Sequence, residues 1–323
     1  NSIDYVACWY VKAADYVRSN KAIRCAFVST NSITQGEQVE PIWRTLLDRG
    51  VIIHFAHRTF KWESEARGKA HVHVVIIGFG LSDHSPKLIF DYSDDETPVV
   101  YSAKNINPYL VDAPTVVVEN RASSICSAPR MTKGNQPSDG GNLILTATEK
   151  DELLVNEPIA APYIHPYLGS DEFLNGNPRY CLWLKDAGPV DLKKCPSVLQ
   201  RLQKVREFRQ KSTAKPTREK AETPQLFFFI SQPDSNFLAI PEVSSERRKY
   251  LPIGYMEPDT IVSNKLWILP GATLYHFGIL TSAMHMAWMR QVTGRLEMRY
   301  QYSGSIVYNT FPWPEKIADE RKA

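Results

Sequence analysis

Two apolar runs near the start of the chain constrain its fold more than any other feature. Val51 to Ala56 and His71 to Phe79 each have the length of a strand, and the first is apolar in the manner of a strand covered on both faces. The residues between them are largely polar and carry no helical periodicity. Two strands joined without a helix are most simply antiparallel neighbours, because a parallel pair needs a crossover connection. We therefore expect these runs to form an antiparallel hairpin.

The residues before this hairpin alternate between helix and strand. Apolar residues recur at helical spacing between Val6 and Val17, which predicts an amphipathic helix over residues 3–18. A short β-type run covers Ile23 to Ser29, and a second helix is expected over about 37–49, ended by Gly50. This order predicts an α/β sheet with a terminal antiparallel hairpin. The sheet of class I S-adenosylmethionine-dependent methyltransferases ends in this way, as can any mixed α/β domain with an antiparallel edge.

The remainder of the chain differs in composition and in its expected secondary structure. Residues 81–223 are rich in Pro, Gly, Asn and Asp and predict an irregular α+β region. Within it, residues 195–215 look helical, with basic side chains on the exposed face, which is either a DNA contact or an ordinary solvated surface. Short strands are expected from Leu226 onward, including residues 226–231, followed by one helix from about Phe277 to Thr293 whose methionines form its core.

Composition excludes several classes of protein. The 323 residues are 43% hydrophobic, which is enough for packed cores. Lys and Arg number 38 against 35 Asp and Glu, so binding of a polyanion would depend on local clusters of charge. No apolar run approaches the roughly 20 residues of a membrane span. Five cysteines without a CxxC spacing argue against a disulfide framework or a zinc site. We expect a cytoplasmic protein without a bound metal.

Several long strings resemble the MmeI-like family of bacterial DNA adenine-N6 methyltransferases, which belong to type IIG and related restriction-modification systems. Long strings of this kind are more specific than any short motif. They flank nearly the whole chain and include Phe27 to Ile33 with Gln35 to Gln38, Phe55 to Trp62, Ala272 to Leu280, Met284 to Trp288, Gly294 to Leu296, and Ser305 to Asn309 with Phe311 to Pro314.

The resemblance implies a domain organisation. Residues 1–85 would be the C-terminal third of the methyltransferase domain, and residues 86–323 would be the target recognition domain, which binds double-stranded DNA. The partners implied are DNA and an upstream methyltransferase region of the same polypeptide, with S-adenosylmethionine as the cofactor of the full-length protein.

Two departures from the family pattern concern chemistry. The catalytic Asn/Asp-Pro-Pro-aromatic motif is missing, since Asn107-Pro108-Tyr109 lacks the second proline and follows the hairpin, and we expect it to form a turn. No glycine-rich loop links a strand to a helix in the way that cofactor binding requires. We therefore expect no cofactor-binding or catalytic motif in this chain, which alone would be inactive.

The target-base pocket has one main candidate. A methyltransferase that acts on duplex DNA must extrude its base and hold it by stacking and by hydrogen bonds. The resemblance places Phe60 as the aromatic side chain that stacks on the flipped base, with Trp62 as a weaker candidate; either could simply pack the hairpin. The loop Thr30 to Ser32 and Gln35 would face the pocket, because ligands bind at the carboxyl ends of strands in open α/β sheets. The same loop could be an ordinary turn.

DNA contacts are expected from cations near the end of the chain. Cations position DNA phosphates, and base-edge contacts supply specificity. The resemblance gives Glu297 and Arg299 the role of base readers: in an extended segment they would point the same way, Glu toward cytosine N4 and Arg toward guanine. A surface ion pair is the alternative. The full set of candidate DNA-binding residues is Glu297, Arg299, Arg295, Arg290, Tyr300, Arg247 and Arg248.

Two rival functions stay open. A stand-alone DNA-binding specificity module without catalytic activity would explain the basic residues, but it has no need of the sheet at the start of the chain. An unrelated enzyme would need a catalytic constellation, and no motif of the Ser/His/Asp, Cys/His or paired-carboxylate kind is recognisable.

Overall fold

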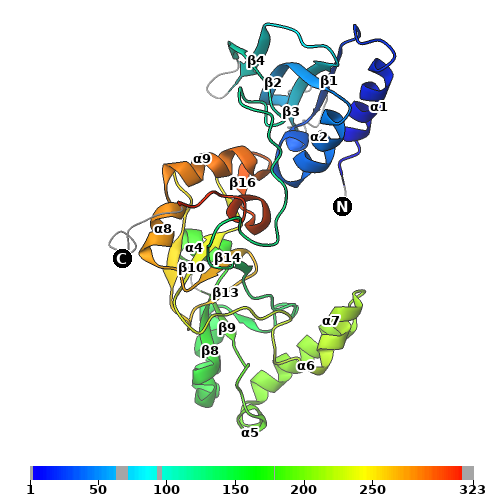
Figure 1. Cartoon of the computed structure of the whole chain (residues 1–323). Coiled ribbons are helices and arrows are strands. Elements are labelled where there is room, and N and C mark those ends of the chain that lie inside the picture. Colours follow the sequence, from blue (N-terminus) through cyan, green and yellow to red (C-terminus); the bar gives the residue numbers. More distant parts are fainter. Residues whose placement is uncertain (1–2, 63–71, 93–96, 178, 315–323) are drawn as a thin grey trace. The chain divides into compact units, whose positions relative to one another are not determined.

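The computed structural model describes residues 3–62, 72–92, 97–177 and 179–314, which fold as a mixed α/β protein with several sheets (Figure 1). The chain divides into two compact units. Unit 1 comprises Asn1–Cys126, Ser244–Arg248 and Met284–Trp313. Unit 2 comprises Ser127–Val243, Lys249–Ala283 and Pro314–Ala323. Among the described residues, no helix is long and apolar enough to cross a bilayer.

Unit 1 is built on a five-stranded sheet of order β1-β3-β2-β4-β5. Strand β3 lies between β1 and β2 and runs antiparallel to both, whereas β2 and β4 are parallel. The predicted hairpin is therefore confirmed. Strands β4 and β5 extend the sheet into a region for which the sequence predicted irregular structure. The strands are β1 (Cys25–Thr30), β2 (Ile52–Trp62), β3 (Val72–Gly80), β4 (Lys87–Asp91) and β5 (Val99–Ala103).

One face of this sheet packs against α1 (Ala7–Val17) and α2 (Val39–Leu47), the two predicted helices. Tyr10 and Trp43 are buried against Ile77 and Phe79 in a single apolar core. The Trp43 indole donates a hydrogen bond to the carbonyl of Ile33 at 2.7 Å, which fixes α2 to the 3₁₀ turns η1 (Asn31–Thr34) and η2 (Gly36–Gln38).

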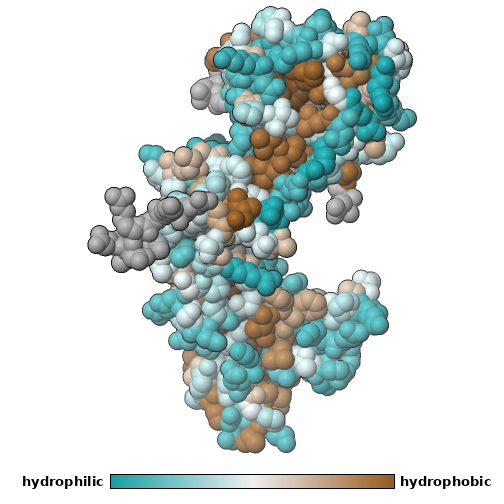
Figure 2. Space-filling model, in the orientation of Figure 1, coloured by the Kyte–Doolittle hydropathy of each residue, from teal (hydrophilic) through white to brown (hydrophobic). Residues whose placement is uncertain are grey.

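The opposite face of the sheet carries apolar residues that stay partly exposed. Val28 pairs with Ile76 and is 47% exposed, and the Phe55 ring lies across Gly78, where a Cβ atom would meet it at 2.0 Å. Figure 2 shows apolar side chains gathered over these strands.

A β-bulge interrupts strand β2. His57 pairs with Ile76 and Phe60 with Val74, so three steps along β2 oppose two steps along β3. The extra residue changes the alternation of side chains, and it places His57 and Phe60 on the same face while re-aiming Arg58 and Thr59. Bulges of this kind often lie next to functional sites.

The last part of unit 1 comes from the end of the chain: α9 (Ala283–Val292), β15 (Gly294–Leu296), β16 (Arg299–Gln301) and the π-helix η5 (Gly304–Tyr308). Backbone bonds join it to the first segment, from Arg121 N–H to the Ser305 carbonyl at 3.1 Å and from Ile125 N–H to the Asn309 carbonyl at 2.8 Å.

The single helix predicted over residues 277–293 is wrong, because α8 (Leu274–Leu280) ends before α9 begins. Thr281 leaves the helical region there, and its hydroxyl bonds the Phe277 carbonyl at 2.8 Å. Within α9, Met286 and Met289 are core residues as expected, but Met284 is 72% exposed.

Unit 2 contains two four-stranded sheets, of order β12-β10-β14-β6 and β13-β8-β9-β7. The strands are β6 (Thr132–Lys133), β7 (Ile144–Leu145), β8 (Ile164–Leu168), β9 (Arg179–Leu182), β10 (Phe237–Pro241), β12 (Gly254–Met256), β13 (Ile261–Val262) and β14 (Leu266–Pro270). Strands β15 and β16 of unit 1 form a separate three-stranded sheet of order β11-β16-β15, with β11 at Val243–Ser244. The helices include α3 (Ala147–Asn156), α4 (Ser170–Asn175), α5 (Pro189–Lys193), α6 (Pro196–Gln210) and α7 (Lys215–Glu219).

Helix α6 corrects two expectations. Arg209, predicted on the exposed basic face, is wholly buried, and its guanidinium donates to five backbone carbonyls. One of these carbonyls belongs to Leu226. The strand predicted over residues 226–231 is wrong, because in this segment only Phe229 pairs with another backbone, in an isolated bridge to Gln136.

Candidate nucleic-acid interface

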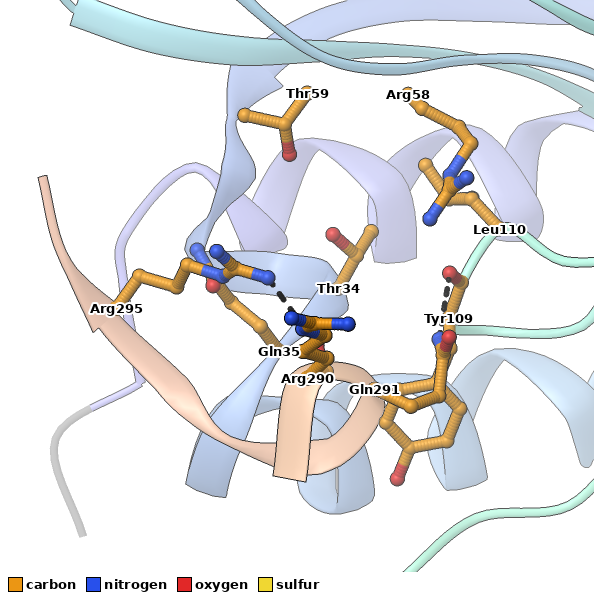
Figure 3. Close-up of a pocket in the computed structure, with 9 residues that line it drawn as sticks. All are labelled: Thr34, Gln35, Arg58, Thr59, Tyr109, Leu110, Arg290, Gln291 and Arg295. Carbon is orange, nitrogen blue, oxygen red and sulfur yellow. Dashed lines mark hydrogen bonds between the residues drawn. The ribbon is translucent and has the colours of Figure 1, made fainter. Parts of the chain in front are cut away.

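A small polar pocket in unit 1 brings together residues from four parts of the chain (Figure 3). Its volume is about 60 Å³. It lies at the carboxyl ends of β1 and β2, the edge of an α/β sheet where ligands commonly bind. It is lined by Thr34, Gln35, Arg58, Thr59, Tyr109, Leu110, Arg290, Gln291 and Arg295, and we call it the arginine pocket.

The sheet side of the arginine pocket comes from the bulge in β2. Because the bulge turns Arg58 and Thr59 out of the regular alternation, both side chains reach the pocket. Arg58 Nη1 donates to Asp91 Oδ2 at 2.5 Å, which anchors the guanidinium. Arg58 was part of a string that carried the resemblance, but sequence analysis gave it no role. The available signal was a basic residue two positions before Phe60, within the same strand.

The opposite side comes from the end of α9 and the start of β15. Gln291 Nε2 donates to the Tyr109 carbonyl at 3.2 Å and so joins α9 to the Asn107-Pro108-Tyr109 segment. That segment is the predicted turn, in which the Asn107 side chain accepts from the Tyr109 N–H at 3.0 Å. Arg290 is exposed, and within the described residues it forms no ion pair.

Arg295 is the most constrained cation of the pocket. Its guanidinium lies 4.4 Å from the centre of the Tyr300 ring, and it donates to the carbonyls of Met298 and Arg290, both at 3.2 Å. Burial lowers the pKa of Arg295, and the nearby positive charges of Arg58 and Arg290 act in the same direction. Tyr300 itself is only 5% exposed, so this candidate DNA-binding residue packs beneath the guanidinium of Arg295 and presents little surface to a ligand.

A close contact between two glycines holds the two sides together. Gly36 has φ +59°, and a Cβ atom on it would lie 2.9 Å from Gly294 Cα. Only glycine tolerates both the backbone conformation and the contact. The hairpin of β15 and β16 therefore begins directly against the loop that follows β1.

The hairpin turn carries the two proposed base readers. Glu297 has φ +61°, so the expectation of an extended segment through Glu297 and Arg299 is wrong: residues 297–298 form the turn between β15 and β16. The side chains nevertheless meet, with Arg299 Nη2 3.1 Å from Glu297 Oε2. Both are exposed at the tip, at 46% for Arg299 and 73% for Glu297. The pair is accessible to a ligand.

Phe60 belongs to an aromatic cluster on the sheet face away from α1 and α2. Its ring stacks on Tyr92 at a centroid distance of 4.8 Å and an interplanar angle of 28°. The Tyr92 hydroxyl also meets His57 Nδ1 at 2.8 Å, and His57 stacks on Phe90 at 4.1 Å. Trp62 lies beside Phe60 and is 45% exposed. Phe60 thus packs within the sheet's aromatic face, with Tyr92 already on one side of its ring.

The remaining candidates lie elsewhere on unit 1. Arg247 is 90% exposed and Arg248 is exposed. In the loop after β1, Asn31 is 9% exposed, and its Nδ2 atom has no hydrogen-bond partner within the described part of the chain. The described residues contain no group of three potential metal ligands, and His71 of the His71-x-His73 pair lies outside them.

Comparison with known proteins identifies the family to which this architecture belongs. Residues 112–315 match the family described as MmeI, target recognition domain, and residues 1–91 match MmeI, DNA-methyltransferase domain. The chain belongs to the MmeI family. The predicted resemblance is thereby confirmed, and the chain contains both target recognition and methyltransferase segments of that family.

Two known proteins are similar to this chain over nearly its whole length. "DNA methyltransferase A" of Bacillus subtilis (strain 168) is 42% identical over 321 residues, which cover 99% of this chain and 36% of that protein. The solved structure of the type IIL restriction-modification enzyme MmeI in complex with DNA superposes with a TM-score of 0.91 at 49% identity, covering all of this chain and 44% of that one. The chain thus spans less than half the length of these relatives.

Proposed function

We propose that this chain recognises a specific sequence in duplex DNA and supplies part of the target-base pocket of a DNA adenine-N6 methyltransferase. The observation that carries the proposal is the joining of two features in unit 1. The arginine pocket lies at the carboxyl edge of the sheet, and an accessible Glu297–Arg299 pair lies on the hairpin that starts at that pocket. The hairpin of β15 and β16 thus connects the proposed base readers, Glu297 and Arg299, to the edge of the sheet.

The strand order supports an assignment of the sheet to the end of a class I methyltransferase domain. In that fold an antiparallel strand is inserted between two parallel ones, as β3 is between β1 and β2. We propose residues 1–85 as the methyltransferase portion and residues 86–323 as the recognition portion. A stand-alone specificity module is the second candidate, but it does not account for this sheet or for the methyltransferase match over residues 1–91.

S-adenosylmethionine is the cofactor that the methyltransferase family implies. The described residues do not fit it: Gly78 and Gly80 end strand β3 without a following helix, so no strand-loop-helix is present there to hold the cofactor. We propose that the upstream methyltransferase region of the same polypeptide binds it, and that this chain alone transfers no methyl group.

Exchange of the charges on the hairpin tests the recognition role. Glu can accept from cytosine N4 and Arg can donate to guanine O6 and N7. In the intact protein, Glu297→Lys with Arg299→Asp should change the preferred base at one position of the methylated motif, as mapped by sequencing of modified adenines. An unchanged motif would show that the pair is only a surface ion pair, which contributes about 0–1 kcal/mol to stability and nothing to specificity. Exchange of the exposed Lys215–Glu219 pair of α7, by Lys215→Glu with Glu219→Lys, provides a matched charge-neutral control away from the hairpin.

A further inference from the structure

The charges around the arginine pocket are unbalanced. Three guanidinium groups line it, from Arg58, Arg290 and Arg295. Asp91 is the acidic partner of Arg58. Within the part of the chain that the structure describes, neither Arg290 nor Arg295 pairs with a carboxylate. Like charges held close together repel, and an anion placed between them removes that repulsion.

Two of the three guanidinium groups of the pocket, those of Arg58 and Arg295, are held in place before any ligand arrives. Asp91 anchors Arg58 at 2.5 Å. Two backbone carbonyls and the Tyr300 ring fix the plane of Arg295. Since these contacts use only some of the five N–H groups of each guanidinium, donors are left for a ligand. Figure 3 shows Arg58 and Arg295 on opposite sides of the pocket, with Arg290 below both of them and Thr59 level with Arg58 at the top.

We propose that the arginine pocket binds one backbone phosphate of the DNA duplex, and that Arg58, Arg290 and Arg295 act there as a clamp that sets the position of the duplex at the sheet edge. The proposal rests on the proposed function and assigns to this pocket a phosphodiester, not a base. Planar guanidinium groups match the oxygens of a phosphate in paired hydrogen bonds. The pocket's volume of about 60 Å³ suits a small anionic group.

The position of the clamp indicates which part of the DNA it would hold. Thr34 and Gln35 follow β1 and line the pocket, and Arg58 and Thr59 lie near the end of β2. A phosphate bound here therefore fixes the neighbouring nucleotide at the carboxyl edge of the sheet. The hairpin with Glu297 starts from the same place, because Gly294 touches Gly36. Phosphate contacts set the register of a duplex, and base contacts supply its specificity.

Salt dependence of DNA binding separates a phosphate contact from a base contact. Each neutralised phosphate adds about one to the slope of log K against log salt concentration. In the intact protein, Arg290→Ala should lower that slope by about one and weaken binding roughly 10-fold, equally for a duplex with the methylated motif and for a scrambled duplex. Arg290 is exposed and its side chain forms no ion pair in the described structure, so the variant should fold. Arg18→Ala removes an exposed arginine outside the pocket and should leave the slope unchanged.

A second measurement locates the phosphate. Methylphosphonates placed singly along the motif-bearing duplex remove one charge at a time. Wild-type protein should lose roughly 10-fold in affinity at one position, and Arg290→Ala and Arg58→Gln should lose nothing further at that same position. An unchanged salt slope in Arg290→Ala, or a loss confined to the motif duplex, would overturn the proposal.

The other anion that a methyltransferase binds is the carboxylate of S-adenosylmethionine. If Arg290→Ala weakens cofactor binding in calorimetry and leaves the salt slope unchanged, the pocket holds that carboxylate and the phosphate clamp is refuted. The slope of log K against log salt concentration can be measured on the scrambled duplex, which carries no recognition motif. Failure of the wild-type protein to methylate any motif would therefore refute the proposed function alone, and the slope would still decide the clamp.

Discussion

Arg209 of helix α6 is the residue whose replacement should cost unit 2 the most stability. Its side chain is 0% exposed. All five N–H groups of a guanidinium find acceptors here, because Nε, Nη1 and Nη2 donate at 2.8–3.0 Å to backbone carbonyls. The acceptors belong to Pro137, Ser138, Lys220, Thr223 and Leu226. One side chain thus holds two loops against the helix.

The expected loss follows from these contacts. A hydrogen bond from a charged donor contributes about 1.5–3 kcal/mol, while dehydration of the guanidinium costs several kcal/mol. Arg209→Met removes both terms and leaves five carbonyls without this donor. We expect the free energy of unfolding to fall by about 3–5 kcal/mol. Arg209→Lys should be intermediate, because an ammonium has three donors.

Urea denaturation of the intact protein, with hydrogen exchange of the peptides covering residues 137–139 and 220–226, measures this loss. Lys204→Met, on the exposed face of the same helix, is the matched control and should change stability little. A loss below about 1 kcal/mol in Arg209→Met would refute the reasoning, because it would mean that water or a rearranged backbone replaces the guanidinium at almost no cost.

Three further predictions concern other groups. Burial lowers the pKa of His285 to about 4. Below pH 6.5 the unfolded chain binds a proton that the folded imidazole does not, so the free energy of unfolding should fall by about 3 kcal/mol as the pH drops from 6.5 to 4. In urea titrations at several pH values, His285→Gln should flatten this dependence. Thr146 and Glu149 form a capping box at the start of α3, so Thr146→Ala should cost about 1 kcal/mol in thermal or urea unfolding. Phe60→Ala should remove about 1–3 kcal/mol of stacking on the flipped base, which would lower both the methylation rate and the fluorescence of 2-aminopurine at the target position while duplex binding is retained. Reduced folding stability would instead show that Phe60 packs against Tyr92.

The parts of the fold that were predicted correctly are those with strong local patterns. Helices α1 and α2 and the hairpin of β2 and β3 follow from apolar periodicity and from the absence of a helical pattern between the two strands. Strands β4 and β5 were missed, because they lie within a stretch rich in turn-forming residues; β4 is placed by pairing with β2, and β5 by pairing with β4.

The candidate site depended on features that one strand or helix does not encode by itself. The bulge that turns Arg58 toward the arginine pocket is a property of the register between β2 and β3. The left-handed backbone at Glu297 arises in a turn whose residues have no strong turn preference. Arg209 is different, since a signal existed: it continues the helical spacing of Val198, Leu202 and Val205, all of which are buried.

The composition of unit 1 from distant segments has a consequence for protein synthesis. Its first segment ends at Cys126, and its last begins at Met284. At 5–20 residues per second, translation of the intervening chain takes roughly 10–30 s. During that interval the nascent sheet lacks the backbone bonds that Arg121 and Ile125 later make to Ser305 and Asn309. The two large segments of unit 2, Ser127–Val243 and Lys249–Ala283, can therefore fold on the ribosome before unit 1 is complete, and a ribosome that stalls after residue 283 releases a chain in which unit 1 lacks its last segment.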